Sequence, residues 1–246
     1  MLVVGGSGSI GSEIAAEAAV AGWEVAIHGR TESSVEAAVE KLRTRAPAAS
    51  ATGFSADLRT PGAVELLVEQ VGSRLGRIDA VVECMSTGPS GIIGRFDETD
   101  PDAYLELAAV SIVHLQRLAR AALPWLSREG GALICFASDA GRFAARRQTM
   151  IGASRAAIMG FVRNLAVEVA ENRVRVHCIS PSFVVGSASI TRLEASGMSR
   201  IEQARRRAGL GLPTPADIAP LVLFLCGPGA KRITGQIISV NGGLNA

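Results

Sequence analysis

Apolar residues recur along this chain in short runs rich in valine, isoleucine and leucine, separated by longer segments with a helical or alanine-rich pattern. Short aliphatic and β-branched runs bounded by glycine, proline or small polar residues are typical of buried strands. We therefore predict strands over Met1–Val4, Glu24–His28, Thr52–Ala56, Ile78–Glu83, Ala132–Ala137, Val174–Ile179 and Gln236–Val240.

The longer segments predict helices over Ser9–Ala21, Glu32–Arg45, Pro61–Leu75, Pro101–Ser127, Met150–Glu171 and Pro215–Cys226. The last helix has a clear start signal, because Thr214 can cap it and proline suits its first position. Strands that alternate with helices imply a parallel sheet, since parallel strands need crossover connections. Right-handed crossovers place helices on both faces, so we expect one α/β domain over residues 1–246 with a doubly wound, seven-stranded parallel sheet.

The composition argues against several classes of partner. Charged residues make up 20% of the chain and its formal net charge is +2, so neither nucleic acid nor a membrane is an expected partner. No apolar run approaches the roughly 20 residues of a membrane span. The four cysteines lie far apart, which indicates free thiols and a cytoplasmic protein, and no spacing typical of metal ligands occurs.

A glycine-rich segment joins the first predicted strand to the first predicted helix. It reads Val4-Gly5-Gly6-Ser7-Gly8-Ser9-Ile10-Gly11. Glycines at such a turn let the backbone approach a pyrophosphate, and the helix N-terminus supplies free N–H groups. The segment therefore predicts a nucleotide site formed by Gly5, Ser7, Gly8, Ser9, Ile10 and Gly11.

The stretch from Ser138 to Arg155 decides how the second half of the chain is interpreted. It reads S-D-A-G-R-F-A-A-R-R-Q-T-M-I-G-A-S-R, and its outline resembles the active-site segment of the short-chain dehydrogenase/reductase family. In that family a serine is followed, thirteen residues later, by Tyr-x-x-x-Lys; here Ser138 is followed by Ile151 at the tyrosine position and Arg155 at the lysine position. The resemblance covers essentially the whole chain and implies a Rossmann-like fold.

The resemblance also bears on the cofactor. Family members that prefer NAD place an acid near the position of Gly29, whereas Gly29 followed by Arg30 resembles the NADP type, because a guanidinium can pair with the 2′-phosphate. A solvated arginine is the alternative. Asp57 and Leu58 match the family's adenine side, with helix capping as the alternative for Asp57. The implied cofactor is NADP(H), while NAD(H) or an empty site stays open.

Most positions that the family uses around the nicotinamide are altered. Its Asn-Asn-Ala-Gly run reads Glu83-Cys84-Met85-Ser86, and Ser111 stands at its helix asparagine. After the sixth strand, Ser182 follows the proline where the family has glycine, and Gly186 replaces a threonine.

The two central replacements differ in their chemistry. Ile151 can neither give nor accept a proton, and Arg155 could still hold a ribose but has a pKa too high for proton transfer near neutrality. The only tyrosine of the chain is Tyr104 and its only lysines are Lys41 and Lys231, all distant in sequence. Among the histidines, we expect structural roles for His28 and His177 and subunit-interface packing for His114.

Arginines gather in two further segments. Arg142, Arg146 and Arg147 precede Ile151, and a second group lies in the segment that forms the substrate lid in relatives, at Arg192, Arg200, Arg205, Arg206 and Arg207. Together they could receive an anionic substrate such as a coenzyme A thioester. Solvated surface charge or salt bridges to a partner subunit are the alternatives.

These observations lead to three hypotheses for function. The first is a non-catalytic or weakly active subunit, assembled as a homodimer, a homotetramer, or a hetero-oligomer with a catalytically intact relative. The second is an active NADP(H)-dependent reductase of a carbonyl or acyl-thioester substrate that takes its proton from water, Ser138 or the substrate. The third is a regulator that senses NADP(H).

Overall fold

The computed structural model describes residues 1–85, 88–188, 190–191 and 200–245. Seven parallel strands form one sheet in the order β3-β2-β1-β4-β5-β6-β7. The strands are β1 (Leu2–Val4), β2 (Val25–Gly29), β3 (Ala51–Ser55), β4 (Ala80–Glu83), β5 (Gly131–Phe136), β6 (Val174–Pro181) and β7 (Ile237–Val240). The predicted Rossmann-like, doubly wound parallel sheet is confirmed.

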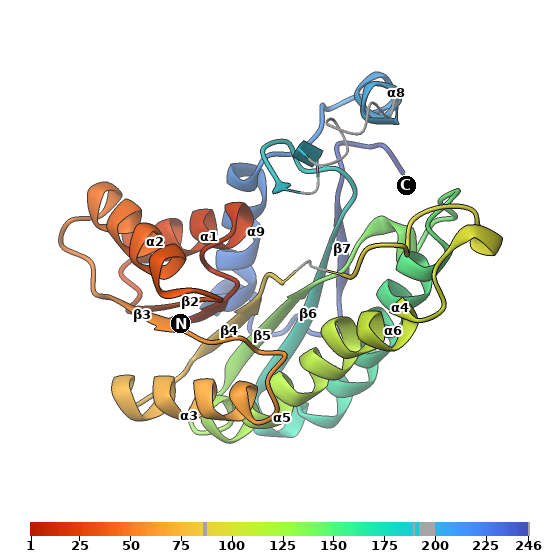
Figure 1. Cartoon of the computed structure of the whole chain (residues 1–246). Helices are drawn as coiled ribbons and strands as arrows, with labels where there is room; N and C mark the ends of the chain where they lie inside the picture. The colour runs from red at the N-terminus through yellow and green to blue at the C-terminus, as the bar shows by residue number, and fades with distance from the viewer. Residues whose placement is uncertain (86–87, 189, 192–199, 246) are drawn as a thin grey trace.

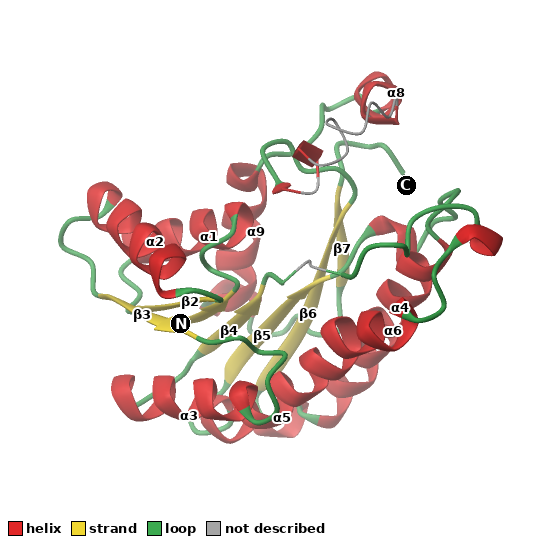
Figure 2. Ribbon diagram, viewed as in Figure 1, coloured by secondary structure: helices red, strands yellow, loops and turns green. Residues whose placement is uncertain are grey.

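Helices cover both faces of the sheet, as Figures 1 and 2 show. One face carries α1 (Ser9–Val20), α2 (Glu32–Arg45) and α9 (Pro215–Cys226), and the other carries α3 (Ala63–Leu75), α5 (His114–Leu126) and α6 (Thr149–Glu168). The strand order reverses between β1 and β4. In open α/β sheets, ligands bind at the carboxyl ends of the strands beside such a reversal.

The core consists of two apolar layers, one on each side of the sheet. Because successive residues of a strand point to opposite faces, Leu2 and Val4 belong to the layer under α3, α5 and α6, whereas Val3 belongs to the layer under α1, α2 and α9. All three of these side chains are fully buried. Strands buried on both faces explain the continuous apolar runs of the sequence.

The helix starts at residues 32 and 215 agree with the sequence prediction. Thr31 caps α2 by accepting a hydrogen bond from the Ser34 amide, at 3.3 Å. At the start of α9, the backbone N–H and the hydroxyl of Thr214 both lie 2.7 Å from the Asp217 carboxylate. Such caps satisfy backbone groups that the first helical turn leaves unpaired.

The predicted helix over Pro101–Ser127 is interrupted. It consists of α4 (Ala103–Ala108), a π-helical turn over Ala109–Val113, and α5. A π turn holds one more residue than an α turn, which the period of apolar residues does not reveal. The turn contains Ser111, and His114 follows it.

A further helix, α8 (Arg200–Arg207), was not among the predicted elements. Ile201, Ala204 and Ala208 are buried at intervals of three and four residues, so an apolar stripe was present in the sequence. Its arginines obscured that stripe. The helix lies near the C-terminus of the chain, beyond the end of β7 (Figure 1).

Within the described residues, no helix is long and apolar enough to cross a membrane. In the same part of the chain, no group of three or more His, Cys, Asp or Glu side chains is placed to hold a metal ion. All four cysteines are free thiols, as expected.

Candidate functional site

The glycine segment forms a tight turn between β1 and the start of α1. The Gly8 amide donates to the Gly5 carbonyl at 3.0 Å, and the Gly8 carbonyl accepts from the Ser12 amide at 2.8 Å. A side chain at position 11 would collide with this turn, because its Cβ would lie 2.8 Å from the Gly6 Cα. No side chain caps the N-terminus of α1, so no capping side chain pairs with the backbone amides at the start of this helix. This geometry fits a pyrophosphate.

His28 holds the glycine turn in place. Its Nδ1 accepts a hydrogen bond from the Gly5 amide at 3.2 Å, which requires the proton on Nε2, and Nε2 donates to the Ala56 carbonyl at 3.0 Å. Burial lowers the pKa of His28 below its usual value. The structural role expected for His28 is therefore a specific one: it ties β2 and β3 to the nucleotide turn.

The end of β2 leaves no room for an acidic side chain. A Cβ at Gly29 would lie 2.6 Å from the Ser7 hydroxyl and 2.8 Å from a methyl group of Val35. The next residue, Arg30, is exposed. Its positive charge contributes to lowering the pKa of Asp57, so the two groups lie near each other.

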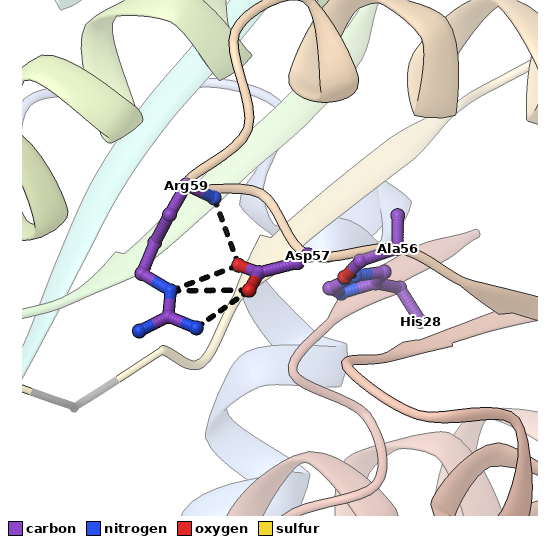
Figure 3. A network of polar contacts seen from close by, with 4 residues as sticks. All are labelled: His28, Ala56, Asp57 and Arg59. Atoms are coloured by element: carbon purple, nitrogen blue, oxygen red, sulfur yellow. Dashed lines mark hydrogen bonds and ion pairs between the residues drawn. The ribbon is translucent and has the colours of Figure 1, made fainter.

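Asp57 is held by Arg59 rather than by a helix N-terminus. The Arg59 guanidinium donates to both carboxylate oxygens, with Nε–Oδ1 and Nη2–Oδ2 distances of 2.9 and 2.5 Å, and the Arg59 amide donates to Oδ1 at 3.1 Å (Figure 3). These bonds lower the pKa of Asp57 to about 2. The α3 helix begins at Ala63 and is preceded by Gly62, so the capping alternative for Asp57 is wrong. Leu58 is buried in the core.

A cleft of about 960 Å³ lies beyond the carboxyl ends of β5 and β6. Its wall combines the loop after β5, the loop before α6, part of α8 and the C-terminal tail. Its lining includes Phe96, Ser138, Asp139, Phe143, Arg146, Arg147, Phe183 and Arg207.

Ser138 opens onto this cleft at the end of β5. Its hydroxyl accepts a long hydrogen bond of 3.4 Å from the Ala140 amide. The neighbouring Asp139 is 2% exposed and accepts hydrogen bonds from Ser180, Ser239 and Asn241, at 3.1, 2.7 and 2.5 Å. Three side-chain donors satisfy this carboxylate, so Asp139 anchors the end of β5 to β6 and β7.

Neither Ile151 nor any tyrosine or lysine belongs to the described lining of the cleft. Ile151 packs on a small apolar cluster formed by Ile92, Ala103 and Leu107. Tyr104 lies on α4, and its hydroxyl is 2.6 Å from the Thr99 hydroxyl. Lys41 lies on α2 and Lys231 follows a short turn after α9.

Arg155 and Glu83 are buried within electrostatic reach of each other. They have 8% and 4% of their surfaces exposed, on the layer that also contains Cys135 and Cys178. Burial lowers the pKa of Arg155, and the charge of Glu83 opposes this effect. Burial likewise raises the pKa of Glu83 to about 7, although the Met85 amide donates to its carboxylate at 2.8 Å and Arg155 attracts it. Burial therefore outweighs the attraction between the two groups.

The remaining predicted positions are dispersed. Ser111 is buried in the π turn. His114 is the first residue of α5 and is buried within this chain, so the predicted packing of its side chain at a subunit interface is wrong. Ser182 lines the cleft, whereas Gly186 does not belong to its described lining. Ser86 and Arg192 lie outside the described residues.

The arginines divide into two sets. Arg146, Arg147 and Arg207 line the cleft. Arg142 instead reaches β7, where it donates to the Ser239 hydroxyl at 3.1 Å, and Arg206 pairs with Glu202 at 3.5 Å on α8. Residues from both of the arginine groups singled out in the sequence therefore meet at one cleft, although they lie about 60 positions apart.

Comparison with known proteins agrees with this geometry. Residues 5–245 match the model of the family described as enoyl-(acyl carrier protein) reductase. An uncharacterised oxidoreductase of Mycobacterium tuberculosis is 31% identical over 247 residues, covering 99% of this chain and 90% of that protein.

Two solved structures share the fold. A short-chain dehydrogenase/reductase from Mycobacterium ulcerans has a TM-score of 0.89 at 24% identity, over 99% of this chain and 88% of that one. A 7α-hydroxysteroid dehydrogenase, solved with NADH and 7-oxo glycochenodeoxycholic acid, has a TM-score of 0.87 at 25% identity, over 98% and 92% of the two chains. The chain belongs to the short-chain dehydrogenase/reductase family.

Proposed function

We propose that this chain is a non-catalytic or weakly active member of its family that serves as a subunit of a homo- or hetero-oligomer. One observation supports the proposal above all: the described cleft contains Ser138 but neither a tyrosine nor a lysine among its lining residues. Ile151 packs on apolar neighbours, and Arg155 is buried. A reduced carbonyl oxygen needs a proton, and positioned acid–base help contributes about 10²–10⁴ in rate.

The nucleotide half supports binding of NADP(H). The glycine turn fits a pyrophosphate, and the exposed Arg30 provides positive charge next to Gly29, which carries no acid. A guanidinium pairs well with a phosphate group. When bound, the cofactor would supply a hydride. This chain's own residues would bind the phosphates at Gly5–Gly11 and offer the Ser138 hydroxyl to a substrate oxygen.

Exposed apolar side chains support assembly. Leu105 on α4 and Val167 on α6 are 84% and 80% exposed, and Val113 and Phe224 are close to half exposed. Large apolar side chains at this exposure are better accommodated at a subunit contact than in water. Assembly surfaces would then be retained in a chain whose chemistry has been lost.

The test is a comparison of the purified chain with I151Y/R155K, which restores the family's pair. NADPH oxidation against ketones and acyl thioesters should be at background for the native chain. A gain of at least about tenfold in the double variant would support loss of a proton donor. Turnover by the native chain that Ser138→Ala abolishes would overturn the proposal.

Glu83 favours a second candidate, a slow NADP(H)-dependent reductase. Its pKa of about 7 suits proton exchange near neutrality, although Glu83 does not belong to the described lining of the cleft. In that case turnover should follow the protonation of Glu83 and disappear in E83Q. A flat pH–rate profile, equal in both proteins, would remove this candidate.

A regulator that senses NADP(H) is distinguished from both by binding alone. Calorimetric titration with NADPH should give a saturable isotherm if the chain reports cofactor to a partner. A purely structural subunit need not bind it.

A further inference from the structure

Three arginines from two distant parts of the chain meet at the cleft that contains Ser138. Arg146 and Arg147 come from the loop before α6, and Arg207 comes from the last turn of α8. All three side chains are exposed, and none forms an ion pair within the described residues. Three like charges that gather at one concave site repel one another and raise the local concentration of anions.

The acids at the cleft are already satisfied. Asp97 accepts from the Arg95 guanidinium at 3.0 and 3.1 Å, so these two charges offset each other. Asp139 is buried and accepts from three side-chain donors. The charge that the described lining presents to a ligand is therefore positive.

Two backbone features add to this field. The α6 helix begins at Thr149, which lines the cleft, and no side chain caps its N-terminus. Its first amides and their dipole favour an anion. Arg147 has a left-handed backbone with a φ of 62°, and its carbonyl accepts from the Gly94 amide at 3.1 Å. A non-glycine residue held in this conformation is frequent at functional sites.

The same cleft has an apolar component. Phe96, Phe143 and Phe183 contribute to its lining, and Phe96 is 58% exposed. A ligand that matches both components combines an apolar body with a charged group. Attraction to three cations grows with the charge of that group, so a dianion is favoured over a monoanion.

We propose that this cleft binds an organic dianion, a phosphate ester or a dicarboxylate with an apolar body, whose charged group lies among Arg146, Arg147 and Arg207. The inference rests on the proposed function in one respect, because it names the ligand of the same cleft. It requires no turnover.

Calorimetric titration of the full chain tests it with phenyl phosphate, phenylsuccinate and benzyl alcohol. At least one of the two dianions should bind about tenfold or more tightly than the neutral alcohol, and the tighter dianion identifies the anionic group. Raising sodium chloride from about 50 to 300 mM should weaken dianion binding and leave the alcohol unaffected.

Variants locate the site. R207Q and R147G should each weaken binding of the tighter dianion about threefold or more. Glycine suits the left-handed backbone at 147, so R147G removes the charge without strain. R43Q, at an exposed arginine on α2, is the matched control and should bind as the native chain does.

Equal binding of benzyl alcohol and both dianions would overturn the inference, as would an equal loss of affinity in R43Q. Circular dichroism and the melting temperature of each variant show whether it is folded. Since binding is measured without turnover, failure here leaves the proposed lack of a proton donor untouched. Robust turnover by the native chain would overturn the proposed lack of a proton donor and leave the inferred anion site untouched.

Discussion

The two ends of the sheet differ in how their polar groups are used. At β1, β2 and β3, the glycine turn, His28 and the Asp57–Arg59 pair form a surface with defined hydrogen bonds and open amides. At β4 and α6, the corresponding groups are withdrawn from solvent: Arg155 and Glu83 are buried near each other, and Ile151 packs on apolar neighbours. Binding geometry and chemical competence are therefore separable in this fold, because each depends on its own side chains.

Disrupting the nucleotide end should have the largest effect. Gly11→Val places a branched side chain against the Gly5–Gly6 backbone, so the turn must move. We expect NADPH affinity to fall about 100-fold or more and the free energy of unfolding to fall by about 1–3 kcal/mol. Calorimetry and urea denaturation measure the two effects.

Gly160→Ala is the control for this change, because a Cβ at Gly160 in α6 meets no atom within 4 Å. It should retain cofactor affinity and gain slightly in stability. An equal loss of affinity in both variants would show that the turn is not specific to the cofactor.

The buried acid at the other end should set a pH dependence. The pKa of Glu83 is raised from 4.5 to about 7, so the folded chain holds this proton more tightly than the unfolded chain does. The free energy of unfolding should therefore fall by about 3 kcal/mol as pH rises from about 4.5 through 7. Urea denaturation between pH 5 and 8 should show this fall as the difference in free energy of unfolding between the native chain and E83Q. An unchanged slope in E83Q would contradict the assignment.

Two buried histidines sharpen the comparison. His28→Leu leaves the Gly5 amide and the Ala56 carbonyl without their partner, so we expect a loss of about 1–3 kcal/mol and weaker NADPH binding. His114→Leu is the matched change, because neither ring nitrogen of His114 has a hydrogen-bond partner within the described residues. At pH 7, His114→Leu should leave the free energy of unfolding unchanged.

At lower pH, His114→Leu should become more stable than the native chain. Burial lowers the pKa of His114 from 6.5 to about 4, so on acidification the unfolded chain takes up a proton that the folded chain refuses. The titration of His114 alone should therefore lower the free energy of unfolding of the native chain by about 2 kcal/mol between pH 7 and 5, relative to His114→Leu. Equal melting temperatures of the two proteins at pH 5 would contradict this.

The smallest effect is expected at the one retained position. Ser138→Ala removes only a 3.4 Å hydrogen bond, so the free energy of unfolding should change by less than about 0.5 kcal/mol. Under the proposed function, cofactor oxidation should not change either. A large loss of turnover would place Ser138 in an active site after all.

The sequence predicted the fold well because apolar periodicity and caps are local. The α2 and α9 helices have the predicted bounds, Glu32–Arg45 and Pro215–Cys226, and α9 begins after Thr214 as its start signal indicated. The π turn at Ser111 escaped prediction, because a single extra residue in a helix leaves the surrounding apolar pattern almost unchanged.

The site was predicted less completely, because its decisive contacts join residues far apart in the chain. Spacing identified Ser138, Ile151 and Arg155 but could not reveal that Arg155 is buried and does not belong to the described lining of the cleft. Nor could it separate Arg207, which lines the cleft, from Arg142, which reaches β7. Such choices are made by tertiary packing.

The anchor at Asp139 has a consequence for how the sheet is completed during folding. Two of its three donors, Ser239 and Asn241, lie about 100 residues farther along the chain, and the Asn241 side chain also donates to the Asn245 carbonyl at 2.7 Å. Until β7 lies beside β6, the carboxylate next to Ser138 lacks most of its side-chain partners and stays hydrated. Contacts between residues so far apart carry a large loop-closure cost, so we expect this edge of the sheet to form late in folding.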